Sequence, residues 1–308
     1  MRQHRIWAPV SMVVVLASMT FFNVNAADYK PINLDPSYNH DRFSTVVTGP
    51  AGEQNHIRNF RAYMTVFDGA DDDNGDGVED RLAIPHYVAY EMRRYEGTLK
   101  KGPKRPSPWI TDKKLWKLRL APKDQTYAYS TAFRSNNPNW YVRGHLCMKQ
   151  HAWRLGANAD WNTHTMLNAV PQRQNFNAGI WLDLEDLTAE WADKYGAVWV
   201  VAGPIFEPEK LTPTDWLGEP KKGEVAAAIP DKLFKIVIRE TEDPNRPEVL
   251  AFAYPQDVGK SNPYDHRPYL FSVDDIEKKT GLDFLTILPD EIEEDIEKVK
   301  AISLWPAE

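Results

Sequence analysis

The chain has 308 residues, of which 42% are hydrophobic and 12% aromatic, enough to bury the core of one large domain or two small ones. This composition excludes an intrinsically disordered chain, and the single cysteine, Cys147, excludes an intrachain disulfide. The net charge of −7 gives no support for nucleic-acid binding by the molecule as a whole, so such binding requires basic residues gathered in one cleft.

Residues 1–26 have the pattern of a secretory signal peptide. Arg2 and Arg5 precede an apolar run at 10–22, and the small residues ending at Ala26 suit a signal peptidase. A membrane anchor is the alternative, but no run reaches the roughly 20 apolar residues of a membrane-spanning helix. We therefore expect cleavage after Ala26 and a secreted or periplasmic protein without a membrane anchor.

The next part of the chain predicts an arm followed by one domain. Residues 27–60 are mostly polar and show little periodicity, which indicates an extended N-terminal arm. Residues 61–67 read as a strand, and residues 82–93 as a strand with a helical alternative. We expect a single domain over 61–308.

The segment between these two strands has the spacing of a calcium loop. Counted from Asp72, oxygen-bearing side chains stand at positions one, three, five and nine, a glycine stands at six, and a backbone carbonyl is available at seven. The glutamate expected at position twelve is missing, and an acidic surface turn is the alternative. The pattern predicts a structural Ca²⁺ site in an insertion at 72–83, with five ligands: Asp72, Asn74, Asp76, Val78 and Asp80.

A basic, proline-containing segment follows at 100–117 and includes Arg105 and Trp109. It reads as an irregular loop. Two interpretations stay open, a solvated surface charge run and one wall of a phosphate-binding cleft.

The stretch 140–191 carries the residues best suited to catalysis. Hydrolysis of a phosphodiester needs a base for water and positive charge for the phosphoryl oxygens. His145 follows Arg143 and Gly144 on a predicted strand, so a base and a fixed cation are neighbours. A lone histidine is more often structural, which leaves His145 a candidate on this evidence.

A predicted helix supplies two further polar side chains. Its apolar stripe is Ile180, Leu184, Leu187 and Trp191. Asn177 and Glu185 lie eight residues apart, about 80° around an ideal helix and about 12 Å along it. One direct ligand and one carboxylate acting through water fit this separation, and sparse oxygen ligation suits Mg²⁺. A surface asparagine and a solvated glutamate are the alternative.

The runs V-R-G-H-L, L-N-A-V-P-Q and N-F-N-A-G-I-W resemble the signature of the DNA/RNA non-specific endonucleases, the sugar-nonspecific nucleases with a ββα-metal site. Later runs, such as V-W-V-V-A-G-P-I-F and I-P-D-K-L-F-K-I-V, are similar to the same family. The resemblance extends over about residues 63–298.

The resemblance implies a role for each matching residue. His145 matches the general base, Asn177 the direct protein ligand of the metal, and Glu185 the carboxylate that holds metal-bound waters. Arg143 matches an arginine near the phosphate, Asn168 an active-site asparagine, and Arg105 an arginine that stabilises the phosphorane. Mg²⁺ or Mn²⁺ is the implied ion.

The chain departs from the family at one position of this motif. The family usually has Asp-Arg-Gly-His, whereas Val142 stands here before Arg143. We expect altered packing or a shifted Arg143, and activity could be reduced. Cys147 lacks the partners of a cysteine nucleophile, and His145, His151 and His164 lack zinc-ligand spacing.

Together these features predict an α+β fold with a central antiparallel β-sheet flanked by helices and a ββα-metal motif. The expected function is hydrolysis of DNA and RNA without sequence specificity, and a homodimer or an inhibitor protein are further expected partners. The alternatives are a calcium-dependent nucleic-acid-binding protein with weak or lost catalysis and a small-molecule phosphodiesterase.

Overall fold

The computed structural model describes residues 27–44, 56–68, 82–98, 102–132, 140–207, 213, 215–218, 223–261 and 263–307. The calcium-loop ligands predicted at 72, 74, 76, 78 and 80 lie outside the described residues, as does the predicted signal peptide at 1–26.

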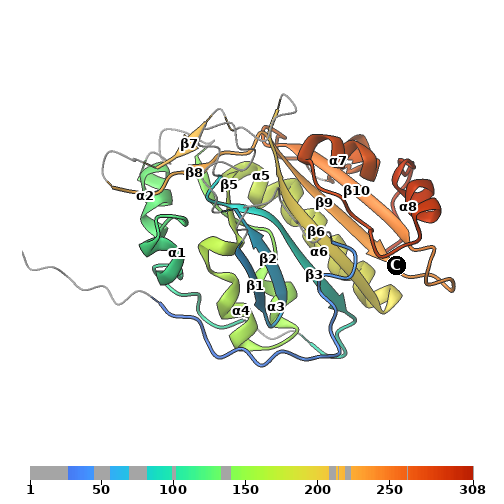
Figure 1. Cartoon of the computed structure of the whole chain (residues 1–308), viewed down its shortest axis with the longest axis horizontal. Helices are drawn as coiled ribbons and strands as arrows, with labels where there is room; N and C mark the ends of the chain where they lie inside the picture. Colours follow the sequence, from blue (N-terminus) through green and yellow to red (C-terminus); the bar gives the residue numbers. More distant parts are fainter. Residues whose placement is uncertain are drawn as a thin grey trace, which may run out of the picture.

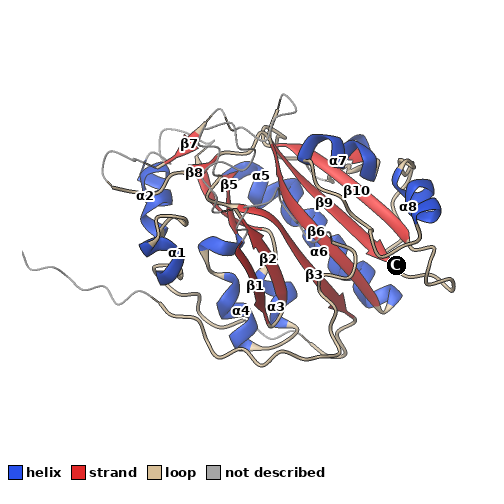
Figure 2. Cartoon of the chain, viewed as in Figure 1, coloured by secondary structure: helices blue, strands red, loops and turns tan. Residues whose placement is uncertain are grey.

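A seven-stranded sheet in which every neighbouring pair is antiparallel forms the centre of the molecule (Figures 1 and 2). In spatial order its strands are β1 (His56–Phe60), β2 (Tyr63–Phe67), β3 (Pro85–Arg93), β6 (Ala197–Ile205), β9 (Lys232–Arg239), β10 (Glu248–Pro255) and β11 (Leu270–Phe271). Two small ribbons pair β4 (Tyr141–His145) with β5 (Ala169–Arg173), and β7 (Trp216–Leu217) with β8 (Ala227–Ala228).

The helices cover both faces of this sheet. They are α1 (Lys113–Lys117), α2 (Asp124–Ala132), α3 (Lys149–Trp153), α4 (Ala157–Thr163), α5 (Gln174–Phe176), α6 (Leu182–Tyr195), α7 (Val273–Thr280) and α8 (Asp290–Glu297). The 3₁₀ turns Met166–Asn168 and Arg267–Tyr269 and the π-helical segment Asn177–Trp181 complete the elements. Each helix in the described part of the chain is too short or too polar to cross a bilayer.

The central strands are apolar on both sides because both faces are covered. In β6, Val198 and Val200 pack on the side of α3, α4 and α6, whereas Trp199 and Val201 pack on the side of α7. Period-two alternation of apolar residues therefore fills two separate cores. The predicted central antiparallel sheet with flanking helices is confirmed.

The predicted N-terminal arm needs a corrected boundary. Residues 56–60 form β1, the edge strand, which pairs with β2. Residues 27–44 have no helix or strand, and Tyr29 bonds the Thr165 hydroxyl at 2.8 Å. The sequence did not indicate β1 because its side chains alternate between half-buried and exposed, and Ile57 is 45% exposed.

Candidate active site

The β4–β5 ribbon brings the Arg-Gly-His and Pro-Gln segments side by side. Gly144 pairs with Val170 and His145 with Ala169. The side chain of Gln172 crosses over Gly144, where an added Cβ would lie only 2.1 Å from its amide carbon. Gly144 is required here because it leaves room for Gln172, which is fully buried.

Gln172 connects this ribbon to Asn177. Its Oε1 accepts a short hydrogen bond from Asn177 Nδ2. Because the Asn177 nitrogen is used in this way, its amide oxygen Oδ1 is the end left to face a cation. The predicted ligand is therefore oriented by a side chain from the strand that pairs with the His145 strand.

The helix around Asn177 is not the regular α-helix that the sequence predicted. Asn177–Trp181 is π-helical, with non-helical dihedral angles at Ala178 and Gly179. An added Cβ at Gly179 would come within 2.9 Å of the Tyr264 hydroxyl. The ideal-helix relation between Asn177 and Glu185 is therefore corrected, because the first turns do not follow 100° per residue.

His145 lies at the end of β4 in an aromatic pocket. Its ring centroid is 4.6 Å from that of Trp109 and 5.1 Å from that of His164. Burial is the main cause that lowers the pKa of His145 well below its usual value, so the imidazole is neutral near pH 7. Nε2 is buried without a hydrogen-bond partner among the described residues, as a base awaiting a proton would be.

Four positively charged or chargeable side chains also lower the pKa of His145: His164, Lys149, Arg105 and Arg143. Arg105 is exposed. Burial lowers the pKa of His164 to about 4, with smaller contributions from the charges of Lys149 and Arg105. Trp109 and the charge of Arg105 therefore belong to the surroundings of His145, and the interpretation of their segment as a wall of a phosphate-binding cleft stays a prediction. We call Arg105, Arg143 and Lys149 the basic cluster.

Arg143 finds a carboxylate partner that the sequence did not reveal. It forms a short ion pair with Asp124, the first residue of α2, and its guanidinium lies over the Trp109 ring at 5.0 Å. Asp124 also accepts a hydrogen bond from the Trp109 backbone N–H at 3.2 Å. Val142 therefore does not leave Arg143 without an acid, since α2 supplies one.

Asn168 is enclosed by backbone groups. Its Nδ2 donates to the carbonyls of Cys147 and Thr163 at 2.9 and 3.0 Å, and its Oδ1 accepts from the Cys147 N–H at 2.8 Å. The side chain is fully buried. This geometry makes Asn168 a brace for the turn after His145, and its role as an active-site asparagine stays a prediction.

Glu185 points into the core beside a buried lysine. It is 5% exposed, and its Oε1 lies 3.9 Å from Lys235 Nζ, which is fully buried on β9 and lies over the Trp181 ring at 4.2 Å. Burial raises the pKa of Glu185 to about 7, and the Lys235 charge opposes this shift. The carbonyl of Glu185 accepts from His151 Nε2 at 2.9 Å, so the first turn of α6 is tied to α3.

These contacts determine which predicted residues come together. Gln172 joins the His145 strand to Asn177, whereas Glu185 is placed in the core behind them, close enough to Cys147 to raise the pKa of that buried thiol. The donors on offer are an amide oxygen and a carboxylate, which suits a hard cation such as Mg²⁺. Cys147 is fully buried, as expected of a small apolar side chain.

Sequence reasoning missed four residues that hold this site: Asp124, His164, Gln172 and Lys235. Gln172 had a signal, because it belongs to the Pro-Gln run, whose two residues pair with Arg143 and Val142 on the neighbouring strand. The other three come from elements distant in sequence, and only the fold brings them to His145, Arg143 and Glu185.

The chain is similar to nucleases of known name. It is 25% identical to "Nuclease 1, mitochondrial" of Schizosaccharomyces pombe over 80% of this chain and 70% of that protein. It is 31% identical to "Nuclease EXOG, mitochondrial" of Danio rerio over 69% of this chain and 62% of that protein. The crystal structure of the EndoG/EndoGI complex, a study of EndoG inhibition, contains a chain with the same fold, with a TM-score of 0.56, 20% identity, and coverage of 77% of this chain and 88% of that one.

The predicted secreted or periplasmic location is wrong by this comparison, because the relatives whose names give a location are mitochondrial. The prediction depended on residues 1–26, whose positive charges and apolar run carry no acid. Basic residues without acids are also a feature of mitochondrial targeting segments, so that part of the composition does not discriminate.

The sequence pattern of the DNA/RNA non-specific endonucleases matches residues 76–291, which is more than half of the chain. This match confirms the resemblance drawn from the Arg-Gly-His, Pro-Gln and Asn-Ala-Gly runs, and with it the prediction of a hydrolytic endonuclease. The family depends on a divalent metal, in agreement with the oxygen donors of Asn177 and Glu185. The chain belongs to the DNA/RNA non-specific endonuclease family.

Proposed function

We propose that this protein hydrolyses phosphodiester bonds of DNA and RNA without sequence preference, with His145 as the general base. The observation that carries the proposal is the neutral, half-buried His145 imidazole with a buried, unpartnered Nε2, set among the side chains of the basic cluster. A neutral base can take a proton from water, and fixed positive charge stabilises the phosphoryl oxygens as negative charge develops.

The proposed role of Asn177 follows from the geometry, and that of Glu185 from the family resemblance. Asn177 holds the metal through Oδ1, and Gln172 keeps that oxygen in place. Glu185 holds water of the hydration shell of the ion. A bound Mg²⁺ or Mn²⁺ supplies Lewis-acid stabilisation of the phosphoryl and leaving oxygens.

The remaining residues place the substrate and the base. Arg143 and Arg105 attract the phosphate, Trp109 and His164 fix the His145 ring, and Asn168 braces the turn that follows His145. Because contacts to the phosphate backbone carry no sequence information, we expect little preference among substrates.

Further parts of the proposal concern partners. An inhibitor protein that covers the basic cluster is proposed from the similarity to EndoG, whose structure includes an inhibitor. A homodimer and a calcium ion in the 72–83 segment stay predictions.

The test is plasmid nicking and RNA degradation with Mg²⁺ or with EDTA, for the wild type, His145→Ala and the control His56→Ala on the edge strand β1. We expect the wild type and His56→Ala to cleave both substrates only with Mg²⁺, and His145→Ala to lose about 100-fold or more. Equal cleavage by His145→Ala would refute the role of this base. Nucleic-acid binding without cleavage by the wild type would favour the binding-protein alternative.

A further inference from the structure

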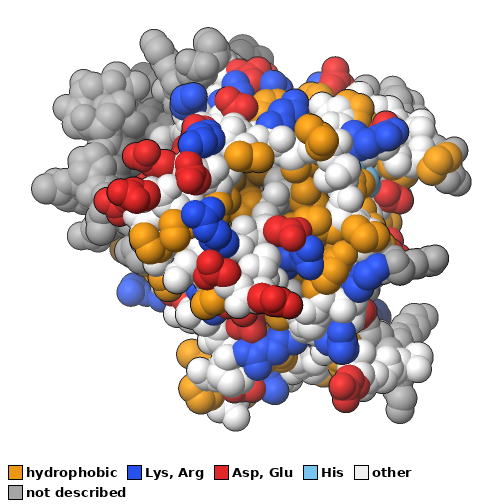
Figure 3. Space-filling view, turned by 90° about the vertical axis from the view of Figure 1, so that its right-hand side faces the viewer, with side chains coloured by type: hydrophobic (Ala, Val, Ile, Leu, Met, Phe, Trp, Pro, Cys, Tyr) orange, Lys and Arg blue, Asp and Glu red, His pale blue; other side chains and the backbone are white. Residues whose placement is uncertain are grey.

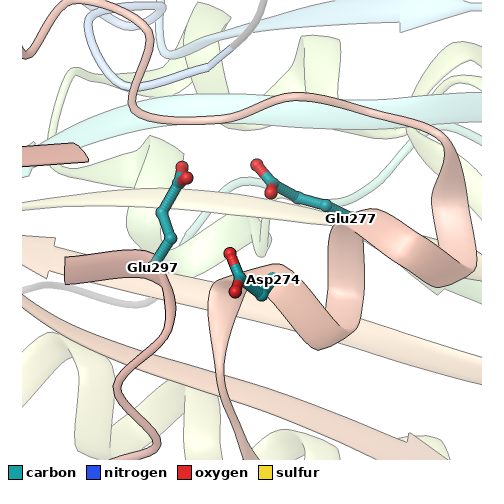
Figure 4. Close-up of side chains that lie close together, drawn as sticks. All are labelled: Asp274, Glu277 and Glu297. Atoms are coloured by element: carbon teal, nitrogen blue, oxygen red, sulfur yellow. The ribbon is translucent and has the colours of Figure 1, made fainter. Parts of the chain in front are cut away.

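Five carboxylate side chains converge between α7 and α8. Asp274 and Glu277 come from α7, and Glu297 ends α8 (Figure 4). The ligand oxygens of these three lie within 4.8 Å of one another, and those of Asp283, Glu293 and Glu297 also do so. Glu297 belongs to both groups and is the point that links them.

This point lies on the face of the sheet away from His145. The apolar side of α7, with Val273 and Ile276, packs on the core that contains Trp199 and Val201. The helix that carries Glu185 packs on the opposite core. A ligand held between α7 and α8 would therefore be separate from the candidate active site.

Glu297 has a buried oxygen that no protein group satisfies. The residue is only 6% exposed, and its Oε1 has no hydrogen-bond partner among the described residues. Oε1 of Glu293 is buried and unpartnered in the same way. Burying a carboxylate oxygen without a donor is costly, so these two oxygens point to a positively charged ligand.

The charged side chains around Glu297 do not stabilise its ionised form. Burial raises its pKa to about 8, and Glu277, Glu293 and Asp274 raise it further, Glu277 also through a side-chain hydrogen bond. The ammonium of the adjacent Lys298 is paired with Asp295 at 2.5 Å.

Glu277 has the same kind of surroundings. Burial raises its pKa to about 7, with Asp283 and Asp274 adding to the shift, and its one opposing donor from the backbone is the Phe284 N–H at 2.7 Å. Among the described residues, the charged side chains that act on Glu277 and Glu297 are therefore acidic.

We propose that Asp274, Glu277, Glu293, Glu297 and Asp283 bind a calcium ion that joins α7 to α8. All donors are carboxylate oxygens, which a hard cation prefers and zinc does not. Calcium takes six to eight oxygens at about 2.3–2.6 Å, so oxygens up to about 5 Å apart can share one ion. Because the ligands come from two helices and the turn between them, the ion would stabilise the C-terminal part of the chain.

The experiment uses the full chain with Asn177→Ala, Asp72→Asn and Asp76→Asn as the parent, which removes the other two predicted metal sites. Calcium binding is measured by titration calorimetry, and thermal unfolding is followed in EDTA and in calcium. Glu297→Gln tests the site, and Glu294→Gln, an exposed acid on the same helix, is the matched control. Glu293→Gln is a second test variant in case Glu297→Gln does not fold.

We expect the parent and Glu294→Gln to bind one calcium ion, with a rise in Tm of roughly 5 °C at about 100 times Kd. Glu297→Gln should lose both the binding and the rise. In EDTA it should melt above the parent, because glutamine removes the cost of burying or protonating this carboxyl group, and calcium should reverse that order. No calcium binding by the parent, or equal binding by the parent and Glu297→Gln, would overturn the proposal.

Discussion

The lack of a side chain at Gly144 leaves room for Gln172, which orients Asn177 in the proposed metal site. The Gly144→Ala variant would place a methyl group 2.1 Å from Gln172, which must then move and release Asn177. We expect the Mg²⁺ concentration for half-maximal nuclease activity to rise about 10- to 100-fold, as for other losses of a residue that orients a metal ligand. Activity titrated with Mg²⁺ measures this.

Two further variants separate an effect on the orientation of Asn177 from an effect on folding. Gly259→Ala is the control, because an added Cβ there meets nothing within 4 Å. In Gly144→Ala/Gln172→Ala the clash is gone but Asn177 is still not held, so thermal stability should return while the Mg²⁺ requirement stays high. An unchanged Mg²⁺ requirement in Gly144→Ala would contradict the proposed role of Gln172.

The charge of Arg105 acts on the base itself. Burial first, and then the neighbouring charges, hold the pKa of His145 well below 6.5, so the acid limb of the kcat profile should lie below pH 6.5. Arg105→Ala removes one lowering charge and should move that limb to higher pH, because activity is lost as pH falls through the pKa of the base. Lys104→Ala, at the adjacent exposed lysine, is the control. The pH–rate profiles of both variants test whether the acid limb moves.

Among the elements, β9 and α6 meet at one ion pair inside the core. Lys235 stands between the apolar Leu233 and Val237 on the face that packs against α6, so Glu185 and Trp181 are the partners of its ammonium. Lys235→Met would leave the Glu185 carboxylate unpaired in the core, at a cost of about 3 kcal/mol or more in unfolding free energy when it is ionised.

The effect of Lys235→Met should depend on pH with a definite sign. The pKa of Glu185 is already raised to about 7, and the variant should raise it further, so stability is lost as pH rises through that value. Urea unfolding in EDTA should show a larger loss at pH 8 than at pH 5.5. Lys232→Met on the same strand, where the lysine pairs with Glu207 nearer the surface, should change little. An equal loss at both pH values would contradict the charge argument.

The elements also differ in how well the sequence predicted them. Strands β6, β9 and β10 follow from their apolar, β-branched runs, and the His145 strand follows from its place after the turn-forming residues that precede Trp140. The π-helical segment at 177–181 was not predicted, because its dihedral angles depend on how Gly179 packs under Tyr264. Neither the Asp124–Arg143 pair nor the Lys235–Glu185 pair has a local signal, since both depend on tertiary packing.

The whole molecule has a net charge of −7, but positively charged side chains gather around His145. The end of the molecule where α8 and the C-terminal segment lie shows basic, acidic and apolar side chains interspersed (Figure 3). Around His145, by contrast, Arg105, Arg143 and Lys149 all act in the same direction. Association with a polyanion should therefore depend on this one region.

Salt dependence measures the effect of these positive charges. If the three cations each contact one phosphate, the logarithm of the DNA association constant should fall against the logarithm of salt with a slope of about −3, and Lys149→Ala should reduce the slope by about 1. Binding of the His145→Ala protein, followed by fluorescence anisotropy in several salt concentrations, gives the slopes. Lys300→Ala, on the far face over Phe271, is the control and should leave the slope unchanged.

In the described part of the chain, the β4–β5 ribbon and the large sheet share no backbone ladder, and Gln256 spans the gap between them. Its amide nitrogen donates to the carbonyls of Pro171 and Pro230 at 3.1 and 2.6 Å, and its oxygen accepts from the Arg173 N–H at 2.8 Å. The ribbon is thus attached to the large sheet by side-chain hydrogen bonds and not by strand pairing. Heating can break the Gln256 hydrogen bonds while the large sheet is still folded, so the enzyme would be inactivated at a lower temperature than the one at which it unfolds.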